Sequence, residues 1–226
     1  MDISATVPGA LNSEIKDIIA KNGRELTALE ANLLSTARKE RDVKTLLVTS
    51  CNPREGKSVA AINMAYALFK DTNLKVLLID GNFRAPRLHG LFNVGPTPGF
   101  ADFILNNTEN VFKDTEFDRI LLMPHGSAVA NPLDVFRAKN FGEKLNVLRE
   151  AFDYVICDGH SVMGASDTSM AARYFDGVVL VVECEKTKWE VMQMSVEKIR
   201  KLQGNVIGTV MNRRKYYIPR SLYGKL

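Results

Sequence analysis

Long apolar runs and cysteines are both scarce in this chain of 226 residues. Apolar segments such as residues 178–182 are far shorter than the ~18–20 residues that a membrane-spanning helix needs. Residues 1–4 lack the basic and apolar character of a signal peptide. Three cysteines, Cys51, Cys157 and Cys184, are too few and too uneven in number for a disulfide framework. We therefore expect reduced thiols and a cytoplasmic protein.

Histidine is equally rare, and excess charge is small. His89, His125 and His160 share no metal-ligand spacing with the cysteines, so the sequence predicts neither a zinc site nor a Ser–His–Asp triad. The formal net charge of +4 does not indicate a nucleic-acid-binding protein. Segment 213–226 has five basic residues and no acidic one, which indicates either a solvated end or contact with acidic lipid headgroups or an acidic partner.

What the chain does contain is a regular alternation of short apolar segments and helical patterns. Strands are expected at 46–49, 76–79, 120–123, 154–157, 178–182 and 206–211. Helices are expected at 13–21, 24–41, 57–69, 99–105, 141–151, 168–174 and 191–202. Strands that are apolar on both faces and separated by helices predict an α/β fold of three layers, with a mainly parallel central sheet flanked by helices. We expect an N-terminal arm with helices (1–42), one domain (43–212) and a basic tail (213–226).

The loop after the first strand is the most informative motif. It reads Pro53-Arg54-Glu55-Gly56-Lys57-Ser58, with Val59 opening the next helix. A strand, a loop ending in Gly-Lys-Ser and a helix are typical of a nucleotide phosphate cradle. In such a loop, glycine permits close backbone approach, lysine reaches the terminal phosphates and serine ligates Mg²⁺. The first glycine of the usual GxxxxGK[ST] pattern is absent, because Cys51 stands there.

Two carboxylates follow apolar strands. Asp80 ends the segment 76–79 and Asp158 ends the segment 154–157. Beside a phosphate loop, such residues are expected to bind Mg²⁺ or to position the nucleophile, whereas elsewhere they would only cap a turn. Arg84 is a candidate phosphate contact. Asn212, after the last strand, either pairs with an adenine edge or makes a turn.

Segments in order along the chain resemble the bacterial tyrosine kinases of polysaccharide biosynthesis, members of the wider ParA/MinD class of P-loop ATPases. The segments are 48–50, 53–58, 76–86, 123–126, 131–132, 152–158 and 208–212. The resemblance covers about three quarters of the chain, from about Thr45 to Asn212. It implies ATP and Mg²⁺ as cofactors, with Gly56, Lys57 and Ser58 as phosphate and metal contacts.

The resemblance also implies roles for the two aspartates and for the tail. Asp80 matches the first aspartate of the Walker A′ motif, which activates the tyrosine hydroxyl, and Asp158 matches the Walker B aspartate. Both are expected to act in catalysis and metal binding together with Lys57 and Ser58. The candidate phosphoacceptors are Tyr216, Tyr217 and Tyr223. The implied partner is a membrane chain-length regulator, a Wzz-like polysaccharide co-polymerase that recruits the protein to the inner face of the membrane; self-association is also implied, and no nucleic acid is expected.

Several positions depart from the family pattern. The second Walker A′ aspartate is Asn82, a loop glycine is Arg54, and the Walker B continuation is Gly159-His160-Ser161. The segment 24–30 lacks the Glu-x-x-Arg-x-x-Arg motif. Three readings therefore remain: a kinase that phosphorylates its own tail, a weakly active or inactive nucleotide-binding regulator of the same pathway, and a ParA/MinD-like positioning ATPase. Asn52, which stands where partition ATPases have a signature lysine, disfavours the third.

Overall fold

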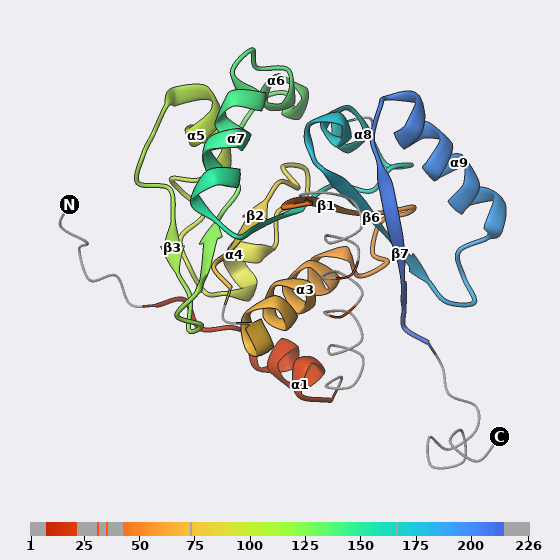
Figure 1. The fold of residues 1–226 in the computed structure, drawn as a ribbon, viewed down its shortest axis with the longest axis horizontal. Helices are drawn as coiled ribbons and strands as arrows, with labels where there is room; N and C mark the ends of the chain where they lie inside the picture. Colours follow the sequence, from red (N-terminus) through yellow and green to blue (C-terminus); the bar gives the residue numbers. More distant parts are fainter. Residues whose placement is uncertain are drawn as a thin grey trace.

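The computed structural model describes residues 8–21, 43–72, 74–165 and 167–214, together with Ala31 and Ser35. Its centre is a seven-stranded sheet in the order β3-β4-β2-β5-β1-β6-β7 (Figure 1). The strands are β1 (Thr45–Ser50), β2 (Val76–Asp80), β3 (Lys113–Asp114), β4 (Ile120–Met123), β5 (Tyr154–Asp158), β6 (Gly177–Glu183) and β7 (Val206–Asn212). All neighbours pair in parallel except the short edge strand β3, which is antiparallel to β4. The expected mainly parallel sheet is confirmed.

The helices lie on both faces of this sheet. They are α1 (Ser13–Lys21), α3 (Lys57–Thr72), α4 (Leu88–Leu91), α5 (Phe100–Asn106), α6 (Pro132–Phe136), α7 (Phe141–Ala151), α8 (Asp167–Ala171), which continues into a 3₁₀ turn (Ala172–Tyr174), and α9 (Trp189–Lys201). Two short helices, α4 and α6, and the two-residue strand β3 were not expected from the sequence, because four- and five-residue helices show no periodicity. The expected helix at 24–41 falls outside the described residues except for Ala31 and Ser35.

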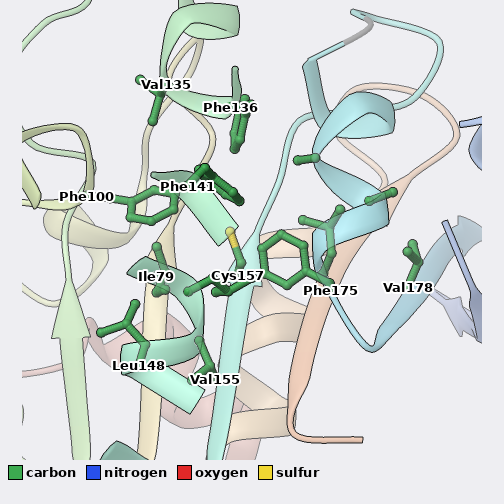
Figure 2. Close-up of a cluster of buried hydrophobic side chains, with 14 of the residues drawn as sticks. Ile79, Phe100, Val135, Phe136, Phe141, Leu148, Val155, Cys157, Phe175 and Val178 are labelled. Carbon is green, nitrogen blue, oxygen red and sulfur yellow. The ribbon is translucent and has the colours of Figure 1, made fainter. Parts of the chain in front are cut away.

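Successive residues of the central strands point to opposite faces of the sheet and build two apolar cores. Leu46 and Val48 of β1 pack with α1 and α3, whereas Leu47 belongs to the core under α5, α7 and α9. Figure 2 shows this second core, where Ile79, Val155 and Cys157 lie among aromatic rings. The rings are those of Phe100, Phe136, Phe141 and Phe175. Burial on both faces explains why these central strands are largely apolar, with polar residues mainly toward their ends.

The parallel arrangement brings the carboxyl ends of β1, β2, β5 and β6 to one edge of the sheet. Residues that follow different strands therefore meet there, at the place where open α/β sheets bind ligands. Within the described residues, no helix combines the length and the apolar composition needed to cross a bilayer. The division of the chain at residues 42 and 212 stays a prediction.

Candidate nucleotide and phosphoryl-transfer site

The phosphate-loop candidate connects β1 directly to α3. Gly56 adopts φ +92°, a left-handed conformation that favours glycine. A Cβ atom at this position would also collide with the side-chain amide of Asn212. Gly56 thus meets both requirements of a cradle glycine, an unusual backbone angle and a close approach. Lys57 and Ser58 begin α3 and are buried.

The loop is braced by the side chain of Glu55, which is only 4% exposed. Its carboxylate accepts hydrogen bonds from the backbone N–H of Asn52 (2.9 Å), the Asn52 Nδ2 (2.9 Å) and the Thr187 hydroxyl (2.6 Å). Asn212 Nδ2 donates to the Glu55 carbonyl oxygen at 2.9 Å. Glu55 therefore fixes the loop shape with its side chain, and Asn212 supports the loop from the end of β7.

Arg54 occupies the loop position where a glycine was expected, and its backbone shows why. The residue is exposed and has φ +66°, in the left-handed region that costs an ordinary residue about 1–2 kcal/mol. Arg54 therefore adopts a backbone conformation that glycine would adopt without strain.

Replacing Arg54 with glycine is expected to raise the free energy of unfolding by about 1 kcal/mol, since relief of backbone strain exceeds the entropy that glycine adds to the unfolded chain. Urea denaturation measures this change. Arg119→Gly is the matched control, because Arg119 is an exposed arginine that lies outside the positive-φ region and should lose stability instead. An equal loss in both variants would show that Arg54 is unstrained.

Asp80 and Asp158 are brought side by side by strand pairing. They are Cα partners in the register of β2 and β5, and both are fully buried. Burial raises the pKa of Asp158 to about 7, the nearby Lys57 ammonium lowers it, and the charge of Asp80 raises it further. Neither carboxylate oxygen of Asp158 makes a hydrogen bond of good geometry among the described residues, although the nearby Ser58 hydroxyl also lowers the pKa. A buried carboxylate with so little compensation favours a bound cation.

Asp80 has a different environment. Its Oδ2 accepts the backbone N–H groups of Arg87 and Leu88 at 2.9 Å each. Burial raises the pKa of Asp80 to about 6, while these amides and Lys57 act in the opposite direction. Asn82 closes the turn after β2 by donating from Nδ2 to the Ala85 carbonyl (2.9 Å), a bond that an aspartate could not make. The Asn82 Oδ1 is buried and has no hydrogen-bond partner within the described part of the chain.

These residues fit a Mg²⁺–nucleotide group. The buried carboxylate of Asp158, the buried Ser58 hydroxyl and the Lys57 ammonium supply oxygen ligands and a cation for phosphates. The left-handed backbone of Gly56 suits a phosphate-binding loop. The predicted residues Lys57, Ser58, Asp80 and Asp158 thus converge, as the sequence pattern required.

The other residues predicted to contact the nucleotide lie outside this buried cluster. Pro53 is exposed on the loop, Val59 is half-buried on α3, and Arg84 is exposed on the loop after β2. Tyr216, Tyr217 and Tyr223 lie outside the described residues. Sequence reasoning missed Thr187, whose contact with Glu55 spans 132 positions in the chain and has no local signal.

A close histidine pair was also missed. His89 on α4 and His125 after β4 have ring centroids 5.0 Å apart. Burial lowers the pKa of His125, and His89 lowers it further. Their spacing of 36 positions matches no ligand motif, so only the fold brings them together.

Comparison with known proteins places this site in context. The tyrosine-protein kinase YwqD of Bacillus subtilis is 28% identical over 215 residues, which cover 94% of this chain and 86% of YwqD. The VpsO kinase domain superposes with a TM-score of 0.74 at 27% identity, covering 87% of this chain and 98% of that domain. The chain is a homologue of bacterial tyrosine-protein kinases. No protein-family model matches the sequence.

More distant structures share the fold of this kinase homologue. The chimerical protein CapA2B2 superposes with a TM-score of 0.81 at 22% identity, covering 93% of this chain and 95% of its own. The septum site-determining protein MinD of Pyrococcus horikoshii superposes with a TM-score of 0.61 at 19% identity, covering 80% and 76%. The fold is therefore that of the MinD-like P-loop NTPases, as the sequence predicted.

Proposed function

We propose that this chain is an ATP- and Mg²⁺-dependent protein-tyrosine kinase that phosphorylates tyrosines of its own tail. The observation that carries the proposal is the register of Asp80 with Asp158 beside Lys57, at the mouth of a glycine cradle. The similarity to YwqD and to the VpsO kinase domain supports the same activity. MinD of Pyrococcus horikoshii, solved with Mg-ADP, supports a nucleotide in this fold.

Bound Mg²⁺-ATP would supply the phosphoryl group and part of the charge neutralisation. Ser58 and Asp158 would hold the metal, and the amides at the start of α3, with Lys57, would hold the phosphates. Asp80, whose pKa is about 6, is mostly ionised at pH 7.5 and can accept the proton that leaves a tyrosine hydroxyl as its oxygen bonds to phosphorus. Burial of both aspartates limits the access of competing water.

The sequence resemblance supports a role in exopolysaccharide or capsule production with a membrane chain-length regulator. The basic segment 213–226 supports contact with the acidic inner face of the membrane. Vesicle sedimentation tests this contact, and charge-reversal of Lys215 and Arg220 should weaken it.

A second function is favoured by Asn82. An amide in place of a carboxylate removes one negative charge beside the site, and its Nδ2 is committed to the Ala85 carbonyl. This arrangement suits a regulator that binds nucleotide and transfers phosphate slowly or not at all.

Removal of the three tail tyrosines distinguishes the self-phosphorylating kinase from the nucleotide-binding regulator. We expect labelled ATP with Mg²⁺ to phosphorylate the full chain, and Tyr216→Phe/Tyr217→Phe/Tyr223→Phe to lose at least about nine tenths of the label, because each variant position lacks the acceptor hydroxyl. Tyr66→Phe, on helix α3, is the matched control and should keep the label.

Three other outcomes would contradict self-phosphorylation of the tail. Nucleotide binding without label would favour the regulator. Lipid- or DNA-stimulated hydrolysis without phosphotyrosine would favour a positioning ATPase. Label that persists in the triple variant would place the acceptor elsewhere in the chain.

A further inference from the structure

Three potential metal ligands from distant parts of the chain meet near the carboxyl end of β2. Asp80 ends β2, His89 lies on α4, and His125 follows β4. One ligand atom from each lies within 4.8 Å of the other two. The Nδ1 atoms of both histidines are buried, and no residue that the structure describes makes a hydrogen bond to them. Two unsatisfied buried imidazole nitrogens facing a carboxylate require an explanation.

The backbone holds these three residues in place. The amides of Arg87 and Leu88 anchor the start of α4 to Asp80 Oδ2, which places His89 Nδ1 3.9 Å from the same oxygen. On the other side, the His125 carbonyl accepts the Ala101 N–H at 3.0 Å. The next amide, that of Gly126, donates to the Pro96 carbonyl at 3.0 Å. The histidines are thus positioned by fixed backbone on both sides.

The two imidazoles and one carboxylate favour one class of metal ion. Imidazole nitrogens with one carboxylate suit zinc and its neighbours among the first-row transition metals, whereas Mg²⁺ prefers oxygen ligands in an octahedral arrangement. The ligand atoms of a tetrahedral zinc site lie roughly 3.3 Å apart. Metal binding would therefore require the two rings to rotate about their side-chain bonds and draw the ligand atoms closer. Because Asp80 Oδ2 already accepts two amide hydrogens, the imidazoles should provide most of the affinity.

We propose that Asp80, His89 and His125 form a binding site for a zinc-class transition-metal cation, distinct from the Mg²⁺ site expected at Ser58 and Asp158. Asp80 would serve both this site and the phosphoryl-transfer site, where it accepts the tyrosine proton. A cation on its Oδ2 side withdraws charge from the carboxylate, so the bound metal inhibits proton acceptance by Asp80. This inhibitory consequence rests on the proposed kinase function, whereas the binding site does not.

Metal binding is tested on the full chain without ATP or Mg²⁺. Titration with Co²⁺ should produce visible absorption bands of a low-symmetry nitrogen- and oxygen-ligated site, saturating at one equivalent. A chromophoric chelator should report Zn²⁺ affinity. We expect His125→Ala and His89→Ala to weaken Zn²⁺ binding at least tenfold, with His160→Gln as the control that keeps it. His125→Gln serves as a second variant, and thermal unfolding confirms that each variant is folded.

The possible outcomes test the metal-binding site and the inhibition of phosphoryl transfer separately. Absence of the Co²⁺ bands, or equal Zn²⁺ affinity in wild type, His89→Ala and His125→Ala, would overturn the site. Where labelled ATP modifies the protein, we expect Zn²⁺ to reduce the label at least tenfold in wild type and much less in His125→Ala. Undiminished label with Zn²⁺ bound would overturn the inhibition. A chain that takes up no label contradicts the kinase function, while the Co²⁺ titration still decides the site.

Discussion

Lys57→Met is expected to reduce phosphoryl transfer by about 10²–10³-fold, the usual cost of removing one preorganised group that stabilises developing charge. Lys57 begins α3 beside Asp158 and Asp80, and its charge lowers the pKa of both carboxylates. Without this cation, the phosphates lose a partner and the buried carboxylates lose their nearest compensating charge.

The measurement is the initial rate of label incorporation from ATP, together with nucleotide affinity. Lys70→Met is the matched control, since Lys70 is exposed in the last turn of the same helix and should keep the full rate. A rate in Lys57→Met within threefold of wild type would show that the loop does not serve phosphoryl transfer.

Asp158→Asn is expected to stabilise the protein while it abolishes activity. In the absence of nucleotide and metal, burial raises the pKa of this carboxyl from an ordinary value of 3.8 to about 7, although Lys57 and the Ser58 hydroxyl act in the opposite direction. A rise of this size corresponds to about 4 kcal/mol of destabilisation once the group is ionised. Asparagine keeps the shape and removes the charge. Stability and activity therefore change in opposite directions.

The dependence on pH has a definite sign. Because the pKa of Asp158 is higher in the folded than in the unfolded chain, the folded state binds more protons between pH 4 and pH 7, and wild-type stability falls as the pH rises through that range. The advantage of Asp158→Asn should be near zero at pH 4 and largest above pH 7. Asp118→Asn, an exposed control, should show no such trend. A constant difference across the range would contradict a buried unpaired carboxylate.

The sequence predicts the central sheet and the candidate phosphoryl-transfer site to different extents. The central strands were predictable because burial on both faces makes them largely apolar, as at residues 46–48 of β1 and 154–157 of β5. Asp80 and Asp158 were predictable because each directly follows such a strand, and parallel pairing places strand ends together.

The remaining features depend on long-range contacts. The Thr187 contact with Glu55 and the meeting of His89 with His125 arise from packing between segments that are distant in sequence. Helix α4 was missed because it depends on Asp80, which binds its first amides, rather than on a periodic apolar pattern. The role of Asn82 as a donor to Ala85 likewise required coordinates, since the residue type alone indicates only a lost charge.

The support that Asn212 gives to the phosphate loop also sets a tether length for the tail. The predicted tail follows this residue, whose amide contacts the Glu55 carbonyl. An extended chain spans at most about 3.5 Å per residue, so Tyr216 and Tyr217 stay within about 14–18 Å of Asn212, whereas Tyr223 can reach about 39 Å. The first two tyrosines therefore remain at high local concentration beside their own loop. Tyr223 has the reach to enter the site of a neighbouring copy.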